Sequence, residues 1–197
     1  MSRFEEYRPR ARGGESPEAT AHHREQRVKD LVVRPAVLDD LADLVMIQAA
    51  REGGDVSDHA ARLRDALDAN RTTPHGTILV AEIEGKLAGL AKTTYFKPAA
   101  DAPENVAPAG WYLSGVIVSP EHRRKGIGRS LTRARLDWIA KRDRWVYYFA
   151  NARNQVSIDL HREFGFEEIT RDFTFPGVTF DGGVGILFRV NLSDGER

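Results

Sequence analysis

Two periods of hydrophobic and polar positions run along this chain, and they predict its elements. Apolar residues at helical spacing predict helices from Leu41 to Gly53, from Ser57 to about Asn70, from Ile127 onward and over 154–163. Runs of β-branched and aromatic residues predict strands, which are 31–35, 77–83, 87–96, 111–118, 145–150, 166–173 and 185–190. The order β-α-α-β-β-β-α-β-α-β-β indicates an α/β fold whose first half is mainly antiparallel.

The two ends of the chain lack this patterning. Residues 1–30 are rich in Arg, Glu, Gly and Pro, with few large apolar side chains to offset the entropy of ordering. We therefore expect a flexible tail over 1–30, one domain over 31–192 and a short tail over 193–197. A length of 197 residues with 41% hydrophobic residues suits one domain with a full core.

Charge and residue types exclude several functions. The formal net charge is +0, so no global attraction to nucleic acid or membrane is expected. The chain has no cysteine, which excludes disulfides, a cysteine nucleophile and thiolate metal sites, and we expect no metal. No apolar run approaches the ~18 residues that cross a bilayer. The expected location is the cytoplasm, because the N-terminus lacks the apolar core of a signal peptide.

A basic, glycine-containing turn follows the strand 111–118. Arg123, Arg124 and Lys125 bring positive charge, and Gly126 and Gly128 remove side chains that would keep a ligand from the backbone. The helix that opens here has unpartnered N–H groups and a partial positive charge at its first turn. Together these features predict a site for a phosphate-bearing ligand.

Two common phosphate-binding loops do not match this turn. The nucleotide-hydrolase loop needs a Lys-Ser or Lys-Thr pair after its glycines, which is missing. The dinucleotide fingerprint needs a third glycine where Leu131 stands. What remains is Arg-x-x-Gly-x-Gly, which resembles the acyl-coenzyme-A loop of the GCN5-related N-acetyltransferase (GNAT) superfamily.

A second segment supports the same resemblance. Members of the superfamily often show Asn-x-x-Ala-x-x-Leu-Tyr-x-x-x-Gly-Phe after the fifth strand. The corresponding residues here are Asn154, Ser157, Leu160, His161, Gly165 and Phe166. Histidine in place of the usual tyrosine is a departure from the pattern. The element order over roughly 31–192 also matches that of the superfamily.

The resemblance implies a fold, a co-substrate and a set of binding residues. The fold is α/β, GNAT-like, with a mixed, mostly antiparallel twisted sheet flanked by helices and a V-shaped cleft between the fourth and fifth strands. Acetyl-CoA is the implied co-substrate, its pantetheine arm bound as an added strand and its pyrophosphate over the turn. The implied binding residues are Ile117, Val118, Arg123, Arg124, Lys125, Gly126, Ile127, Gly128, Arg129, Asn154 and Ser157.

The implied reaction moves an acetyl group from a thioester to an amine. The backbone N–H of Val118 is the expected donor to the thioester oxygen. His161 stands where the superfamily places its acid, and a histidine with an ordinary pKa near 6.5 donates a proton near neutrality. Tyr147 and Tyr148 are the alternative proton donors, and a structural role is the alternative for His161.

The general base is left open. Many members of the superfamily carry a carboxylate on the fourth strand, which has none here. Ser114 or Tyr112 can hold a water, with Glu82 or Glu84 accepting the proton through it. Alternatively, no residue acts as base and the cleft lowers the pKa of the amine.

The acceptor side predicts a small amine. Carboxylates and aromatic residues share the segments expected to surround it, which suits a polyamine or amino sugar. The leading hypothesis is an N-acetyltransferase of a small-molecule primary amine, in the manner of aminoglycoside antibiotic resistance. Acetylation of a protein N-terminus or lysine, and a non-enzymatic acyl-CoA sensor, are the alternatives. A homodimer is compatible with the resemblance, and the sequence identifies no interface.

Overall fold

A computed structural model describes residues 2–3, 30–72, 75–180 and 182–195. Most of the predicted N-terminal tail therefore lies outside the described residues. Within it, β1 (Ser2–Arg3) pairs in parallel with β8 (Val178–Thr179). At the other end, the predicted tail overlaps a 3-10 turn over Leu192–Gly195.

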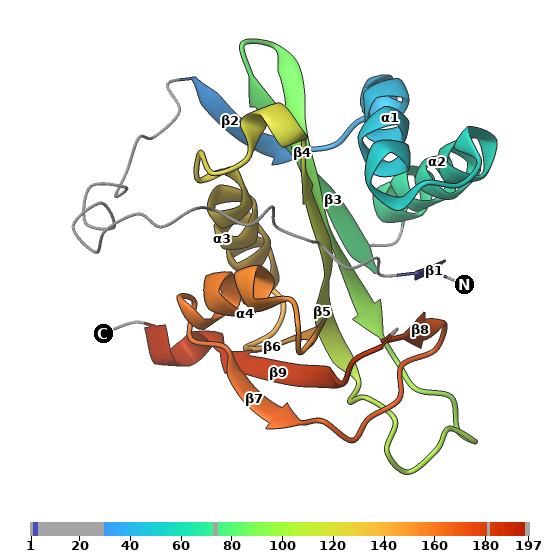
Figure 1. Ribbon diagram of the computed structural model, residues 1–197, viewed down its shortest axis with the longest axis vertical. Coiled ribbons are helices and arrows are strands. Elements are labelled where there is room, and N and C mark those ends of the chain that lie inside the picture. Colours follow the sequence, from blue (N-terminus) through green and yellow to red (C-terminus); the bar gives the residue numbers. More distant parts are fainter. Residues whose placement is uncertain (1, 4–29, 73–74, 181, 196–197) are drawn as a thin grey trace.

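A seven-stranded sheet forms the centre of the described part of the chain, in the order β2-β3-β4-β5-β6-β9-β7 (Figure 1). Neighbouring strands are antiparallel, except that β5 and β6 are parallel. The mixed, mostly antiparallel sheet of the prediction is confirmed. Its strands are β2 (Leu31–Pro35), β3 (Gly76–Ile83), β4 (Lys86–Phe96), β5 (Gly110–Val118), β6 (Trp145–Asn151), β7 (Glu167–Thr170) and β9 (Gly185–Asn191).

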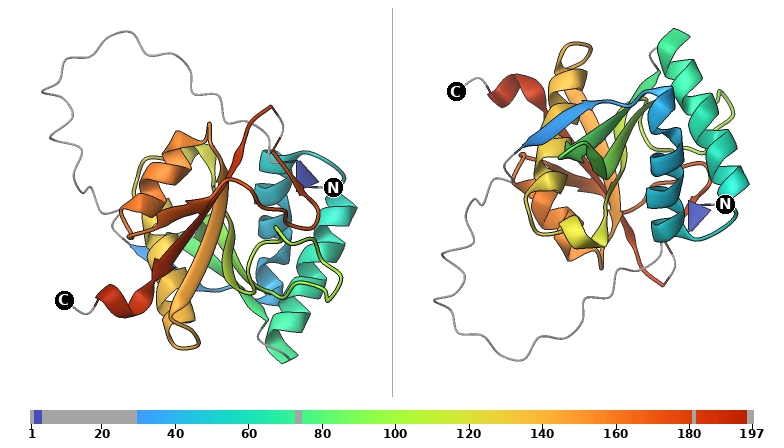
Figure 2. Two further views of the ribbon diagram at one scale, coloured as in Figure 1. Left: turned by 90° about the horizontal axis from the view of Figure 1, so that it is seen from below. Right: turned by 90° about the horizontal axis from the view of Figure 1, so that it is seen from above.

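Helices cover both faces of the sheet. α1 (Leu41–Glu52) and α2 (Val56–Thr72) lie on one face, and α3 (Ile127–Ala140) and α4 (Gln155–Arg162) lie on the other (Figures 1 and 2). The alternation of side chains along each strand explains this arrangement, because successive residues point to opposite faces. We call the face under α1 and α2 the acceptor face, because the acceptor is expected to enter from the side of these two helices. We call the other the helix-α3 face.

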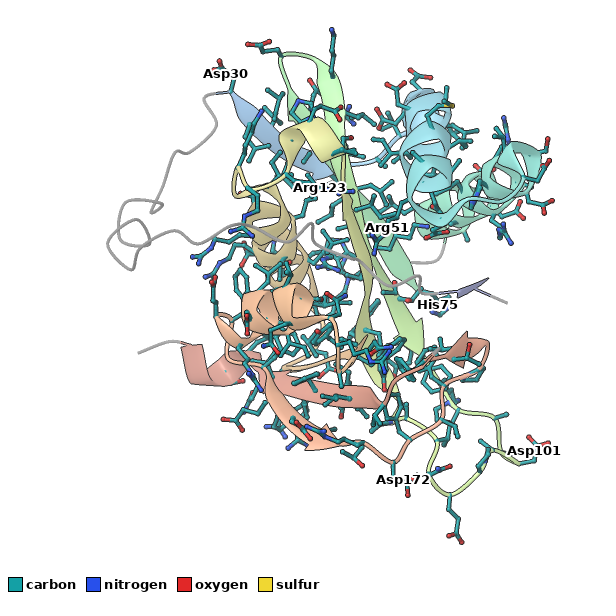
Figure 3. The ribbon with its side chains drawn as sticks, viewed as in Figure 1. Asp30, Arg51, His75, Asp101, Arg123 and Asp172 are labelled. Carbon is teal, nitrogen blue, oxygen red and sulfur yellow. The ribbon has the colours of Figure 1, made fainter. Side chains whose placement is uncertain are left out.

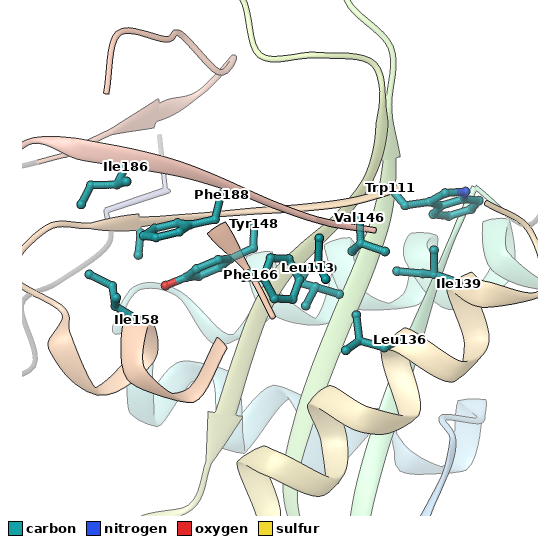
Figure 4. Packing of buried hydrophobic residues seen from close by; sticks show 12 residues of the cluster. Trp111, Leu113, Leu136, Ile139, Val146, Tyr148, Ile158, Phe166, Ile186 and Phe188 are labelled. Carbon is teal, nitrogen blue, oxygen red and sulfur yellow. The ribbon is translucent and has the colours of Figure 1, made fainter. Parts of the chain in front are cut away.

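Each face has its own hydrophobic cluster. On the helix-α3 face, Leu136 and Ile139 pack against Trp111, Val146 and other residues of β5, β6 and β9 (Figure 4). On the acceptor face, apolar residues of α1 and α2 pack on β3 and β4; they include Leu44, Val45, Leu63, Leu67, Val80 and Leu90. The sheet is thus buried on both sides, and both helix pairs are held in place by apolar packing.

Three local predictions were wrong. The residue pattern predicts Ser57 as the N-cap of α2, but the Asp55 carboxylate accepts the backbone N–H of Ser57 at 2.7 Å and takes that role. The pattern also predicts Val156 as an inward residue of α4, but Val156 is 53% exposed, whereas Ile158 and His161 are buried. The predicted strand 166–173 is shorter, ending at Thr170.

Candidate active site

The cleft begins where β5 and β6 part. These two parallel strands pair only at Trp111–Val146 and Tyr112–Tyr147. From Leu113 to Val118, β5 keeps one edge on β4 and turns its other edge toward the space between the strands. β5 and β6 are the fourth and fifth strands of the main sheet. The V-shaped opening therefore lies where the resemblance implies.

A β-bulge accompanies the parting of the strands. Leu113 pairs with Thr93 and Val116 pairs with Ala91, so two residues of β5 face one residue of β4. One of the two is Gly115, whose φ of 130° is a backbone conformation that favours glycine. A glycine inside a strand predicts such a bulge, which here interrupts β5 beside the opening between the strands.

The register of β5 decides which backbone groups face the cleft. Ser119 donates its N–H to the Ala88 carbonyl of β4 at 2.9 Å. Bonded and non-bonded pairs alternate in an antiparallel ladder, so the backbone groups of Val118 point away from β4 and those of Ile117 point toward it. The N–H of Val118 is therefore directed as an oxyanion donor must be. The predicted backbone contact of Ile117 is not available in this register.

The basic turn has the geometry that an anion requires. Gly126 precedes α3 with φ 78°, Arg124 has φ 64°, and both residues are exposed. Ser130 donates to the Gly126 carbonyl at 3.0 Å, which is the first helical bond of α3. The amides of residues 127–129 precede it and have no carbonyl of the helix to bind. A Cβ added at Gly126 would meet no atom within 4 Å, so the space beside this glycine is open.

Two arginine side chains of the turn already have partners within the protein. Arg129 forms an ion pair with Glu163 across α3 and α4, so only its backbone N–H faces the predicted pyrophosphate site. Arg123 Nε donates to the Val118 carbonyl at 3.2 Å and braces the end of β5. A cavity of about 50 Å³ lies beside it, between α1 and the end of β5, and Arg51 and Arg123 both line it (Figure 3).

The start of α4 provides the opposite wall of the cleft. Asn154 caps the helix, its Oδ1 accepting the Ser157 N–H at 3.3 Å. Tyr148 of β6 donates its hydroxyl to Ser157 Oγ at 3.3 Å. Burial raises the pKa of Tyr148 to about 12, so this hydroxyl keeps its proton at neutral pH. Its ring is held in the helix-α3 cluster with the hydroxyl directed toward α4 (Figure 4).

His161 is buried, and its ring lacks the second proton that would make it a cationic acid. Its Nδ1 lies 2.8 Å from the Ser157 carbonyl, which only accepts, so Nδ1 carries the ring proton. Its ring stacks on Tyr148 at 3.8 Å between centroids, and the residue is 2% exposed. Burial, together with the charge of Arg135, lowers the pKa of His161 to about 3. The ring is neutral at pH 7, which favours the structural role of His161 over the acid role. Of these two side chains, Tyr148 is then the one that keeps a proton to donate.

The predicted base system does not assemble. Glu82 is bound to Arg34 of β2, whose Nε and Nη2 reach its Oε2 at 3.0 and 2.9 Å. This ion pair makes Glu82 a structural residue on β3, which β4 and β5 separate from β6. Ser114 lies in the bulge, half-buried, while the Tyr112 hydroxyl is already given to the Pro108 carbonyl at 2.7 Å. These contacts therefore identify no carboxylate of the described residues as the general base.

Two cations near the bulge, one fully buried and one half-buried, were missed by sequence reasoning. Arg135 of α3 is 0% exposed, and Lys92 of β4 is half-buried on the acceptor face. Arg135 stands four residues from Leu131 and four from Ile139, both fully buried. A charged residue interrupting an apolar row at that spacing was the signal that could have found it.

Comparison with known proteins identifies the class. The model of the acetyltransferase (GNAT) family matches residues 41–166 of this chain. Among proteins with curated descriptions, none is similar enough in sequence to count as a match. The family match spans more than half of the chain and contains both the basic turn and the α4 segment. The chain belongs to the GNAT acetyltransferase family.

Solved structures agree with the fold. The ribosomal-protein-alanine N-acetyltransferase of Brucella melitensis is 25% identical, with a TM-score of 0.61 over 82% of this chain and 99% of its own. The phosphinothricin acetyltransferase of Sinorhizobium meliloti, solved with acetyl-CoA, is 21% identical, with a TM-score of 0.62 over 85% and 91%. The protein yncA of Salmonella typhimurium, solved with its cofactor acetyl-CoA, is 20% identical, with a TM-score of 0.62 over 86% and 98%.

The protein is an acetyl-CoA-dependent N-acetyltransferase. The open amides at the start of α3 and the free edge of β5 fit the pyrophosphate and the pantetheine arm of this co-substrate. Bound acetyl-CoA supplies an activated acetyl group as a thioester. Beside this cleft the Val118 N–H points away from β4, and the Tyr148 hydroxyl keeps its proton beside α4. No helix of the described residues is long and apolar enough to cross a membrane.

Proposed function

We propose that the protein acetylates the primary amine of a small molecule that also carries an anionic group. One observation carries this proposal: the Lys92 ammonium lies on the acceptor face at the bulge, half-buried beneath α1. The bulge adjoins the opening between β5 and β6, so an acceptor that reaches the cleft from this face passes Lys92. An ammonium in this place is a point charge for a carboxylate, phosphonate or phosphate of the acceptor.

Polar contacts hold Lys92 in position. Its Nζ donates to Gln48 Oε1 at 2.6 Å, and Gln48 Nε2 donates to Glu52 Oε2 at 2.9 Å. Burial lowers the pKa of Lys92, and the charge of Arg62 lowers it further, against the opposing effect of Glu52. A bound anion would offset this cost, because an opposite charge nearby favours the charged form of the lysine.

Three carboxylates that would suit a polycationic acceptor, Asp55, Asp101 and Asp172, do not gather into one pocket. Asp55 caps α2, and Asp172 accepts a hydrogen bond from Asn105 at 2.8 Å. Asp101 and Asp172 lie in loops at the opposite end of the molecule from Arg123 (Figure 3). These contacts favour an acceptor with an anionic group over an aminoglycoside, whose charges are all positive.

Aromatic side chains supply the rest of the acceptor face. Phe96, Tyr112, Tyr147 and Phe175 form a cluster in which Phe96 and Phe175 lie 4.4 Å apart between ring centroids. Tyr112 and Tyr147 are buried, so only the partly exposed rings of Phe96 and Phe175 can offer apolar surface to an acceptor of small size. With Glu82 engaged by Arg34, the amine reaches its neutral form through the low polarity of the cleft.

The test is a panel of primary amines with acetyl-CoA, followed by release of free thiol. The panel contains amino acids and aminophosphonates, their neutral amides and esters, and aminoglycosides. We expect turnover of the anionic amines and a KM raised by about tenfold or more in Lys92→Met, as expected when a hydrogen bond to a charged group is lost. Lys97→Met, at an exposed lysine just after β4, is the matched control. Preferred turnover of an aminoglycoside, or an unchanged KM in Lys92→Met, would contradict the proposal.

Acetylation of a protein N-terminus is a second candidate. It is favoured by the 25% identical Brucella melitensis protein, which is named a ribosomal-protein-alanine N-acetyltransferase. Peptides that begin with alanine belong in the same panel. Faster turnover of such a peptide than of any small amine would select this function.

A further inference from the structure

Arg135 is a fully buried cation in the third turn of α3. It is 0% exposed, and among the described residues it forms no ion pair with a carboxylate. Burial lowers the pKa of Arg135 to about 9, which still leaves the guanidinium charged at neutral pH. A buried charge without a counterion is costly, so its retention calls for a specific set of contacts.

Those contacts are backbone carbonyls of the two strands that flank the bulge. Arg135 Nη1 donates to the Gly115 carbonyl of β5 at 3.1 Å and lies 3.3 Å from the Lys92 carbonyl of β4. Nη2 donates to Thr132 Oγ1 at 3.0 Å, and Thr132 is itself 0% exposed. One guanidinium therefore joins β4, β5 and α3 at a single point.

Both carbonyls belong to residues of the bulge. The register of β4 and β5 shifts between Ala91 and Thr93, so Lys92 of β4 and Gly115 of β5 fall outside the paired positions. Buried carbonyls need a hydrogen-bond donor, and Arg135 donates to both of them from the helix below. An apolar residue at position 135 would remove these hydrogen bonds from the bulge.

We propose that Arg135 is a positioning residue for acetyl-CoA: its buried guanidinium holds the bulge at Gly115 and so fixes the edge of β5 along which the pantetheine arm binds. The bulge is where β5 stops following β6, so its geometry sets the opening of the cleft. Arg135 acts through the backbone and does not touch the co-substrate. The inference rests on acetyl-CoA binding in this cleft and is independent of the acceptor.

The test compares two ligands by titration calorimetry. Acetyl-CoA contacts both the turn before α3 and the edge of β5, whereas ADP carries the pyrophosphate for the turn and lacks the pantetheine arm. In Arg135→Met we expect the affinity for acetyl-CoA to fall by about tenfold, because the hydrogen bonds that hold the bulge are lost, with ADP changed by less than about twofold. Arg135→Lys keeps a charged donor and is expected to restore most of the affinity for acetyl-CoA.

Arg133→Met is the matched control, because Arg133 lies on the same helix and is exposed. It should leave the affinity for both ligands unchanged. Unchanged acetyl-CoA affinity in Arg135→Met would overturn the proposal, and so would equal losses for acetyl-CoA and ADP, which indicate a general loss of structure.

A second variant keeps the proposal open to refutation should Arg135→Met fail to fold. Thr132→Val has nearly the same shape and removes the hydrogen bond that orients Nη2. We expect it to fold and to show the same selective loss for acetyl-CoA, smaller in size. Wild-type affinity for acetyl-CoA in Thr132→Val would then reject the role of the guanidinium. Neither ligand involves the acceptor, so these results do not depend on the proposed substrate.

Discussion

Replacement of His161 by glutamine tests whether this histidine is a neutral structural residue. Its ordinary pKa is 6.5, and in the folded protein burial lowers the pKa to about 3. Between these values the unfolded chain binds a proton at this site and the folded chain does not. The free energy of unfolding therefore falls as the pH falls through this window, and the His161 contribution is fully present only above about pH 6.5.

The magnitude follows from the difference in pKa. At pH 5 the site is 1.5 units below its unfolded pKa, and each unit corresponds to about 1.4 kcal/mol. We therefore expect His161 to account for about 2 kcal/mol of the stability lost between pH 7 and pH 5. Glutamine does not titrate, so His161→Gln should lose about 2 kcal/mol less over the same interval, whatever its stability at pH 7.

Chemical denaturation at pH 7 and pH 5 measures this difference. All other groups contribute equally to the two proteins, so the comparison isolates His161. His75→Gln is the matched control, because His75 is exposed at the start of β3. It should keep the pH dependence of the wild type. If His161→Gln loses as much stability as the wild type between pH 7 and pH 5, His161 is not held neutral in the folded protein. A protonated His161 could then act as the acid.

Two further predictions concern the turn and the edge of the sheet. Gly126→Ala should fold, with a loss of about 1 kcal/mol of unfolding free energy because alanine is strained in the left-handed backbone of Gly126. It should lower the affinity for acetyl-CoA by about tenfold, as measured by calorimetry. Full affinity would show that the amides at the start of α3 are not the binding surface. The Asp40 carboxylate accepts two hydrogen bonds from Arg34, at 2.7 and 2.9 Å. Asp40→Asn removes its charge and should lower the free energy of unfolding by about 1–3 kcal/mol. The Arg34 guanidinium lowers the pKa of Asp40, so its contribution is present above the ordinary carboxyl pKa and lost as pH falls below it; equal acid sensitivity of both proteins would contradict this.

The features that sequence reasoning found are local in the chain. Arg123, Gly126 and Gly128 lie within one turn, and the helix that follows supplies the free amides, so the whole anion site is contiguous. The order of strands and helices was likewise read from periodicity, and the fold followed from it. Such features depend on neighbouring residues and are little altered by the rest of the structure.

The assignments that failed depend on contacts between distant segments. His161 matched the position of an acid, but its neutrality comes from burial, from Tyr148 and from Arg135 on another helix. Glu82 was a plausible base until β2 placed Arg34 against it. No pattern in the residues near Glu82 or His161 reports these partners.

The sequence by itself indicated the family and the co-substrate through the resemblance of two motifs, each contiguous within a few residues. It also predicted a phosphate site, because a turn, two glycines and a helix start form a complete anion site within one short segment. The tertiary structure decided which backbone groups of β5 face the cleft and which side chains are ionised. It also brought Lys92 under α1 and Arg135 under the bulge. Strand register and burial are properties of the assembled sheet, and they set the direction of each N–H and the pKa of each buried group.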